Sequence, residues 1–253
     1  EALAEDPRFQ EQLIDAASSM YVGPAWDLDS RVTPLIHPPE GALLKGLTEL
    51  EEGESWWLEP SPSPDNPRIW SPGIKVGVKP NSFSHVTEFF GPLLSVLVAE
   101  DMDEALAWAN GTAYGLTAGF HSLDTDDHNV FLARMNAGNL YINRTTTGAI
   151  VRRQPFGGRK ASCFGPGAKA GGPNYVALFS HLRDGEKGGR VPTKAPEVQR
   201  LKETLNAQQP GRGDRLESAI ASYYGAAEGV FSQEVDPSKI RGQDNVFRYQ
   251  NHM

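Results

Sequence analysis

Residues 93–143 carry the pattern that most restricts the fold, because strand-like apolar runs alternate with helix-like stretches across short joins. Leu93 to Ala99 (LLSVLVA) is a continuous apolar run, as expected for a strand that is covered on both faces. A helix is predicted to follow Asp101, with Glu104 three residues later in the arrangement of a capping box. The next predicted elements are a strand at 117–123, a helix at 124–136 and a strand at 139–143. This order predicts an α/β fold with right-handed crossovers and a parallel sheet.

The residues before this pattern predict further elements of the same domain. Asp6 followed by Pro7 is a typical helix start, and apolar residues between Phe9 and Met20 recur on one helical face. The later expected elements are a short amphipathic helix within 40–55 and strands at 56–62 and 69–78. Helices and strands are thus predicted throughout the first 143 residues, and they alternate from residue 93 onward.

A long glycine-rich segment, Asn143 to Tyr175, follows the last predicted strand. Gly148, Gly157 and Gly158 permit backbone angles closed to other residues and let main-chain N–H groups approach a ligand. The segment leaves the carboxyl end of a predicted parallel strand, which is where open α/β sheets bind ligands. Its composition alone is equally typical of a long surface connection. The order of its residues, considered below, favours a receptor for a carboxylate.

Charge and cysteine content exclude several functional classes. The net charge of −8 and the absence of a long basic block argue against a nucleic-acid partner. No apolar run approaches the roughly 18 to 20 residues that span a bilayer, and the first residues lack the features of a signal peptide, so we expect a cytoplasmic protein without a transmembrane segment. Cys163 is the one cysteine, which excludes an intrachain disulfide. The six histidines show no ligand-like spacing, so no metal site is predicted.

Three motifs in the glycine-rich segment carry a family resemblance. TTTGAI at 145–150, QPFGG at 154–158 and GPGAKAGGPNY at 165–175 closely resemble the end of the aldehyde dehydrogenase catalytic domain. The similar branch is the one that oxidises L-glutamate γ-semialdehyde, the 1-pyrroline-5-carboxylate dehydrogenases. The resemblance implies that Thr147, Gly148 and Ala149 form the aldehyde anchor, whose main-chain amides hold the substrate's α-carboxylate. It also implies that Phe156 forms a wall of the substrate pocket.

Residues 87–92 (TEFFGP) resemble a second signature of the same family, E-x-F-G-P. This resemblance implies that Glu88 accepts hydrogen bonds from the nicotinamide-ribose hydroxyls of NAD and that Phe90 packs beside the nicotinamide. An ionised carboxylate can accept two hydroxyl donors, so the residue type suits this role. Taken alone, the motif is also typical of an exposed acid before a Gly-Pro turn. Its occurrence upstream of QPFGG favours the cofactor role.

The resemblance implies that the chemistry of the family is only partly present in this chain. The family's catalytic cysteine lies shortly before the helix that corresponds to residues 7–20, so we expect the nucleophile upstream. The oxyanion-hole asparagine, the general-base glutamate and the nucleotide-binding sheet are expected there too. Cys163 follows PFGGRKAS, where the family usually carries a small residue and no nucleophile. We therefore predict no catalytic residue in this chain, and no turnover by the chain alone.

The expected parent is an NAD-dependent enzyme that oxidises L-glutamate γ-semialdehyde, a small-molecule aldehyde, to L-glutamate in proline catabolism. The fold implied is an aldehyde-dehydrogenase-like α/β domain with a mostly parallel sheet flanked by helices, plus an oligomerisation strand and a helical tail. Two alternatives stay open: a non-catalytic module of the same fold that serves assembly, and an aldehyde dehydrogenase for another substrate. Retention of both Glu88 and the Thr147-Gly148-Ala149 anchor favours enzymatic ancestry.

Three regions are predicted along the chain. Residues 1–171 correspond to the C-terminal half of the catalytic domain with its anchor loop, and the missing N-terminal half of the enzyme is the expected partner. Residues 172–182, with a strand at Tyr175 to His181, correspond to the family's strand that pairs with a neighbouring subunit, which implies a homo-oligomer. Residues 183–253 are predicted to form a linker, helices at 196–206 and 215–226, and an ending that resembles the extension of bifunctional proline-utilization proteins.

Overall fold

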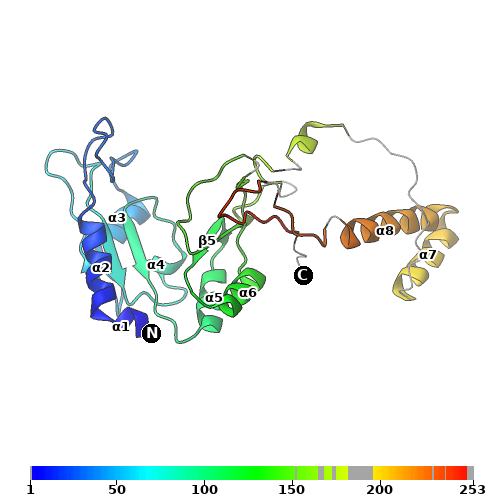
Figure 1. The fold of residues 1–253 in the computed structure, drawn as a ribbon, viewed down its shortest axis with the longest axis horizontal. Coiled ribbons are helices and arrows are strands. Elements are labelled where there is room, and N and C mark those ends of the chain that lie inside the picture. The colour runs from blue at the N-terminus through cyan, green and yellow to red at the C-terminus, as the bar shows by residue number, and fades with distance from the viewer. Residues whose placement is uncertain are drawn as a thin grey trace. The chain divides into compact units, whose positions relative to one another are not determined.

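The computed structural model describes residues 2–151, 153–164, 168–172, 175–181, 196–229, 231–236 and 238–249. They divide into two units, each of which is considered by itself (Figure 1). Unit 1 comprises residues 1–146 and 157–167, and unit 2 comprises residues 147–156 and 168–253. The three-region division expected from the sequence stays a prediction.

The second helix of unit 1 begins where its capping residue predicts. Helix α1 spans Ala2–Glu5 and α2 spans Pro7–Ser18. The carboxylate of Asp6 accepts a hydrogen bond from the backbone N–H of Arg8 at 2.9 Å, which satisfies one of the free donors of the first turn. The apolar face of α2 is only partly buried, and Met20 beyond its end is 44% exposed.

A three-stranded sheet lies beside α2 in Figure 1. Its strands are β1 (Ser55–Leu58), β2 (Gly73–Val76) and β3 (Leu93–Val96), in the order β1-β2-β3. The central strand β2 pairs antiparallel with β1 and parallel with β3. Two further helices belong to this part, α3 (Gly41–Thr48) and α4 (Phe83–Val86). Ile74 and Lys75, adjacent on β2, are each only 1% exposed.

A second layer of unit 1 packs around two parallel strands, β5 (Thr117–Phe120) and β6 (Asn139–Ile142). Helix α5 (Met102–Asn110) precedes β5 and helix α6 (Thr125–Arg134) joins the two strands, as Figure 1 shows. A minor antiparallel pair, β4 (Tyr114–Gly115) with β7 (Arg159–Lys160), flanks them in sequence. The core of this layer is formed by buried Leu106, Phe131, Met135 and Ala137. The predicted α/β class is therefore confirmed.

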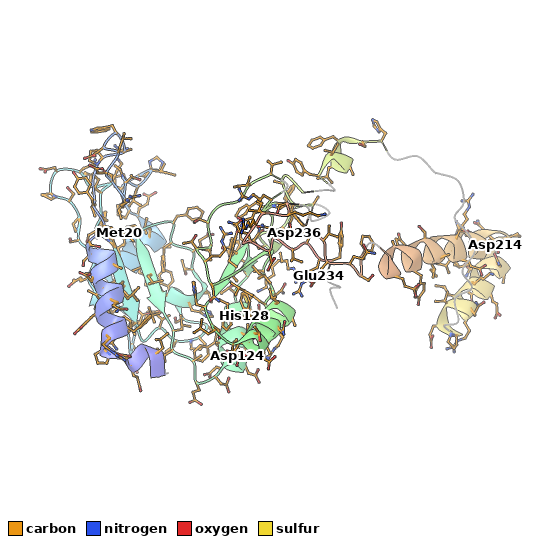
Figure 2. The ribbon with its side chains drawn as sticks, in the orientation of Figure 1. Met20, Asp124, His128, Asp214, Glu234 and Asp236 are labelled. Atoms are coloured by element: carbon orange, nitrogen blue, oxygen red, sulfur yellow. The ribbon has the colours of Figure 1, made fainter. Side chains whose placement is uncertain are left out.

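The Asp101 cap of α5 matches the sequence prediction, and α6 has a similar cap. The Asp101 carboxylate accepts a hydrogen bond from the N–H of Glu104 at 2.8 Å, and the Glu104 carboxylate in turn accepts one from the N–H of Glu100 at 2.8 Å. Asp124 caps α6 by accepting from the N–H of Asp126 at 2.8 Å; Figure 2 labels Asp124 at the start of this helix. Side chains that satisfy the free N–H groups of a first turn mark helix starts reliably.

Two expectations about the strands need correction. The predicted strands at 93–99, 117–123 and 139–143 do not share one sheet within this chain, because β3 pairs with β2 whereas β5 and β6 pair with each other. Alternation of strands and helices predicts parallel pairing, but it does not specify which strand is the neighbour. The run at Leu93 is also not covered on both faces by the described residues, since Leu94 is 45% exposed.

Unit 2 contains a helical hairpin, formed by α7 (Pro196–Gln208) and α8 (Arg212–Glu228). Both helices were predicted, with shorter bounds. The ammonium group of Lys202 on α7 pairs with the carboxylate of Glu217 on α8, which ties the two helices together. The predicted strand at Tyr175 to His181 is wrong, because Val176–Phe179 forms a short 3₁₀ helix, η1. No described strand pairs with this segment, so its backbone bonds locally, for example from the Leu178 N–H to the Tyr175 carbonyl at 3.2 Å.

The C-terminal tail of unit 2 folds around Asp236, which Figure 2 labels together with Glu234. Its carboxylate accepts hydrogen bonds from the Ser238 hydroxyl at 2.7 Å and from the N–H groups of Lys239 at 3.0 Å and Asn245 at 3.2 Å. The Ser238 hydroxyl and these backbone donors lower the pKa of Asp236 to about 2. Asn245 also accepts a long bond of 3.5 Å from the Gln154 amide, so this tail contacts the glycine-rich segment.

Candidate functional site

The loop at residues 87–92 (the 87–92 loop) connects the end of α4 to the start of β3. Exposure alternates along it: Glu88 is exposed, Phe89 is half-buried and Phe90 is 81% exposed. The loop therefore presents the two residues predicted to contact NAD, while the residue between them is held by the protein. Glu88 makes no hydrogen bond or ion pair with any other described residue, so both of its carboxylate oxygens can accept donors from a ligand.

Phe89 anchors the 87–92 loop between α3 and α4. Its ring meets Phe83 of α4 in an edge-on arrangement, with the ring centroids 5.6 Å apart. On the other side it lies against Gly46, where an added Cβ would come within 2.6 Å of the Phe89 ring. The absence of a side chain at Gly46 thus makes room for this anchor. Sequence reasoning assigned no role to either residue, because their contact links elements that are far apart in the chain.

Phe90 has an unusual backbone conformation, with φ at 50°. Positive φ is strained for a bulky side chain and persists only where the surroundings hold it. The side chain of this strained residue is almost fully exposed. An exposed aromatic ring on a strained backbone, two residues from the exposed carboxylate of Glu88, is suited to contact with a flat ligand.

Helix α4, which leads into the 87–92 loop, is tied to its neighbours through His85. The ring Nδ1 accepts a hydrogen bond from the N–H of Asn81 at 2.9 Å. The same ring therefore donates from Nε2 to the carbonyl of Trp108 on α5, at 3.2 Å. The histidine fastens α4 to α5 and is not a candidate for proton transfer in this arrangement. No local sequence signal indicates this role, because the partner lies on another element.

The predicted substrate residues lie in unit 2, whereas Glu88 and Phe90 lie in unit 1. Thr147, Gly148 and Ala149 are exposed, and Gly148 has φ at 106°, in the region that favours glycine. A short turn follows, closed by reciprocal backbone bonds between Ile150 and Gln154 at 3.1 and 2.7 Å. The expectation of unusual backbone angles is thus met at Gly148, whereas neither Gly157 nor Gly158 has a positive φ.

Phe156 and the glycines beside it are held by backbone pairing. Phe156 exchanges two backbone bonds with Ala170, at 3.0 and 2.9 Å, and its residue surface is 36% exposed. The backbone N–H of Gly157 donates to the side chain of Asn139 at 3.2 Å, so this amide serves the protein's own structure. Phe156 therefore has a paired backbone and a partly exposed ring.

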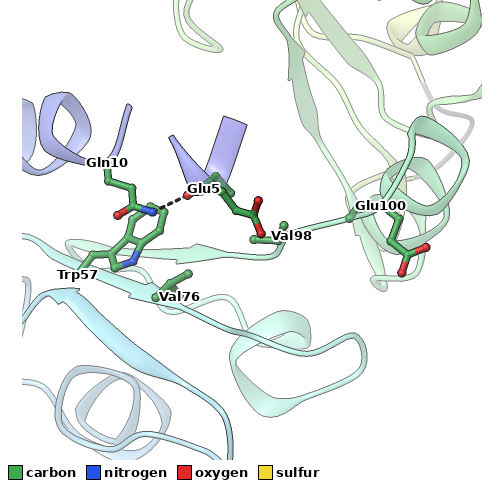
Figure 3. A pocket seen from close by; sticks show the side chains of 8 residues that line it. Glu5, Gln10, Trp57, Val76, Val98 and Glu100 are labelled. Carbon is green, nitrogen blue, oxygen red and sulfur yellow. Dashed lines mark hydrogen bonds between the residues drawn. The ribbon is translucent and has the colours of Figure 1, made fainter. Parts of the chain in front are cut away.

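Figure 3 shows a pocket of about 330 Å³ in unit 1 that is separate from the predicted residues. Its lining includes Glu5, Gln10, Trp57, Val98 and Glu100. The Gln10 amide donates to the carbonyl of Ala4 at 2.6 Å, which uses part of its polar capacity. The lining contains none of the residues that the sequence motifs single out.

The cysteine, the possible metal ligands and the helices are further features that bear on function. Cys163 is half-buried, and its backbone N–H donates to the Lys160 carbonyl at 3.1 Å. Within the described part of the chain, no group of three or more His, Cys, Asp or Glu side chains could hold a metal ion. None of the helices in that part is long and apolar enough to cross a membrane.

Comparison with known families identifies the fold. The model of the aldehyde dehydrogenase family matches residues 4–184. The chain belongs to the aldehyde dehydrogenase family. This confirms the resemblance carried by the motifs at 87–92 and 145–175. This aldehyde dehydrogenase chain also has relatives in the predicted branch. It is 37% identical over 171 residues to 1-pyrroline-5-carboxylate dehydrogenase from Bacillus pumilus (strain SAFR-032), covering 66% of this chain and 30% of that protein.

Solved structures of the family agree with this placement. Proline utilization A (PutA) from Corynebacterium freiburgense matches with a TM-score of 0.83 and 42% identity over 96% of this chain and 24% of that chain. A 1-pyrroline-5-carboxylate dehydrogenase from Thermus with bound NAD matches with a TM-score of 0.59 and 32% identity over 68% of this chain and 33% of that chain. This aldehyde dehydrogenase chain thus spans between 24% and 33% of the length of these relatives.

Proposed function

We propose that this chain is part of an NAD-dependent dehydrogenase that oxidises L-glutamate γ-semialdehyde to L-glutamate in proline catabolism, in the cytoplasm. The observation that carries the proposal is the 87–92 loop, which presents Glu88 and Phe90 outward while Phe89 anchors it. The names of the relatives, 1-pyrroline-5-carboxylate dehydrogenase and proline utilization A, support the substrate and the pathway.

The residues of the 87–92 loop fit NAD chemically. The Glu88 carboxylate would accept hydrogen bonds from two ribose hydroxyls, since it has no described partner of its own. The exposed ring of Phe90 would pack against the flat nicotinamide and keep its face turned to the substrate. NAD, when bound, supplies the two-electron oxidising chemistry. The relative from Thermus that was solved with bound NAD supports this cofactor.

The anchor residues fit a substrate that carries a carboxylate. With Gly148 at φ 106°, successive main-chain N–H groups of residues 147–149 can point to one side of the chain and form a cradle for an anion. Ala149 leaves room beside this cradle because its side chain is a single methyl group. Phe156, with its backbone paired to Ala170, would form one wall of the pocket.

The 253 residues alone are proposed to be inactive, since the one thiol, Cys163, is a structural residue in this view. The proposed partner is the N-terminal half of the same enzyme, which would contribute the nucleophile and the nucleotide-binding sheet. We propose a homo-oligomer as well, with the segment at 172–182 as its contact. The exposure of Val176 (73%) and Phe179 (77%) supports this, because apolar groups in such a segment gain from being covered.

NADH formation tests the proposal directly. The chain and a polypeptide extended upstream through the expected cysteine are each supplied with NAD and glutamate semialdehyde. We expect NADH formation by the extended polypeptide and none by the 253 residues. Turnover by the 253 residues would refute the view of Cys163 as structural. Absence of NADH formation by a folded extended polypeptide would favour a non-catalytic module or an aldehyde dehydrogenase for another substrate.

A substitution at the anchor tests the substrate assignment. Ala149→Val in the extended polypeptide adds two methyl groups beside the proposed carboxylate cradle. We expect the KM for glutamate semialdehyde to rise about tenfold or more, equivalent to about 1.4 kcal/mol of lost binding, with the KM for propionaldehyde unchanged. Ala161→Val, at an exposed position of unit 1, is the matched control. Equal losses for both aldehydes would count against a carboxylate anchor.

A further inference from the structure

A buried ion pair in unit 1 is not used by the proposed chemistry. The Nζ of Lys75, on β2, lies 3.2 Å from a carboxylate oxygen of Glu54, and both side chains are 1% exposed. The ammonium group also lies 5.0 Å from the centre of the Trp56 ring. Burial of two charges costs several kcal/mol per ion, so such a pair adds little net stability compared with apolar side chains of similar size. Its value lies in fixing the directions of the groups that it binds.

Lys75 binds two segments besides Glu54. Its ammonium group donates to the carbonyl of Glu49, the residue that ends α3, at 2.8 Å. It also contacts the hydroxyl of Ser84 in α4 at 3.3 Å, and Ser84 is 3% exposed. One side chain on β2 thus fastens the end of α3 and the middle of α4. These are the two helices between which Phe89 of the 87–92 loop is held.

Glu54 holds the lysine ammonium group in place. Burial alone would raise the pKa of Glu54, but hydrogen bonds from the Glu51 N–H, from Ser84 and from Lys75 outweigh it and lower the pKa below its ordinary value. The Glu51 N–H donates to the same carboxylate oxygen that faces Lys75, at 2.8 Å. The second oxygen, Oε1, is buried without a partner among the described residues. The Glu54 carboxylate is therefore held by contacts of one oxygen to Glu51 and Lys75.

We propose that Lys75 and Glu54 are positioning residues that hold the 87–92 loop in the conformation that presents Glu88 and Phe90. The link runs from Lys75 to Ser84, then along α4 to Phe83, and from the Phe83 ring to Phe89. Release of α3 and α4 from β2 loosens the packing of Phe89 between these two helices. Glu88 and Phe90 then lose their fixed directions. The role of the loop in cofactor binding rests on the proposed function, whereas its dependence on the buried pair does not.

A double substitution distinguishes a positioning role of the Lys75–Glu54 pair from a contribution of the pair to stability. Lys75→Met alone leaves Glu54 charged and buried without its partner, which is strongly destabilising and can unfold the unit. Lys75→Met combined with Glu54→Leu removes both charges and keeps the apolar volume. Lys202→Met combined with Glu217→Leu removes a more exposed Lys–Glu pair from the α7–α8 hairpin and serves as the control. Ser84→Ala removes one hydrogen bond of Lys75 and one of Glu54 and tests the link at its first step.

Hydrogen exchange on the 253-residue chain is the first readout, because it needs no turnover. In the Lys75/Glu54 double variant, the backbone amides of the 83–92 segment, which end at Gly91 because Pro92 has none, are expected to exchange at least about fivefold faster, as for a segment that has lost its tie to the core. Residues 125–142 should exchange as in the unsubstituted chain. Ser84→Ala should give a smaller effect in the same segment, and the Lys202/Glu217 control none. Unchanged exchange at 83–92 in the folded double variant overturns the proposal, whether or not the enzyme is active.

The second readout separates positioning from general damage. In the extended polypeptide, the double variant is expected to raise the KM for NAD about tenfold, while the KM for glutamate semialdehyde stays within about twofold. A purely structural role would raise both KM values together or lower the amount of folded protein. Faster exchange at 83–92 with an unchanged KM for NAD would also overturn the positioning role. Absence of NADH formation by the unsubstituted extended polypeptide contradicts the proposed function, and the exchange result still decides the role of the pair.

Discussion

Replacement of Phe131 by alanine tests the packing on which the β5–β6 layer depends. Phe131 on α6 is 3% exposed, and its ring stacks on Phe120 of β5 with the centroids 5.0 Å apart and the planes at 16°. Truncation of a fully buried phenylalanine costs about 3–5 kcal/mol, which includes the cavity that it leaves. Of this, roughly 0.5–1.5 kcal/mol comes from the lost ring pair. In a unit of this size, the melting temperature should fall by about 10 °C.

Urea unfolding followed by circular dichroism measures this loss of stability. Phe164→Ala is the matched control, because the same side chain is removed from a position that is 99% exposed. We expect the control to change the free energy of unfolding by no more than about 0.5 kcal/mol. Phe120→Leu in a double-mutant cycle with Phe131→Ala isolates the contribution of the ring pair. A loss below about 1 kcal/mol for Phe131→Ala would refute the view that this ring supports the layer.

Three further predictions concern a cap, a close contact and a carboxylate. Asp101→Ala should lower the free energy of unfolding by about 1 kcal/mol in the same urea assay, because the cap of α5 is lost, whereas Asp101→Asn should keep most of it. Gly46→Ala should speed hydrogen exchange at 87–92, because the new Cβ displaces Phe89; unchanged exchange would contradict the anchor role. The pKa of Asp236 is lowered to about 2 from 3.8. The contribution of its carboxylate to folding stability is therefore complete above pH 3.8 and is lost as the pH falls through about 2. The Lys239 amide shift, measured by NMR, should follow that window and lose this dependence in Asp236→Asn.

The local elements were predictable because their signals are local. Asp6, Asp101 and Asp124 each accept a backbone hydrogen bond within the first turn of a helix, so a single short stretch contains both the donor and the acceptor. The glycine at 148 was singled out for the same kind of reason, since its backbone angle depends on the absence of its own side chain. Features that depend on two distant segments gave no comparable signal.

Strand partners and the segment at 175–181 show where sequence reasoning stops. Period and apolar content identify β3, β5 and β6 as strands. The pairing of β3 with β2, however, depends on which strand edge is available in three dimensions. Tyr175 to His181 has the composition of a strand, yet a strand needs a neighbour to bond with. Without one among the described residues, Val176–Phe179 satisfies its backbone within a 3₁₀ turn.

The 87–92 loop depends both on a local sequence motif and on contacts between segments that are distant in the chain. Glu88 and Phe90 belong to a short motif, so resemblance to a family was enough to single them out. The groups that hold the loop are not in the motif: Lys75 reaches the carbonyl of Glu49 across 26 positions of the chain. A lysine within a strand pattern is ordinarily taken as solvent-exposed, because isolated charges are rarely buried. Burial of this lysine becomes favourable only because Glu54 is folded beside it, which no spacing along the sequence can indicate. A motif therefore predicts what a site binds, whereas the precision with which the site is held depends on contacts that exist only in the folded chain.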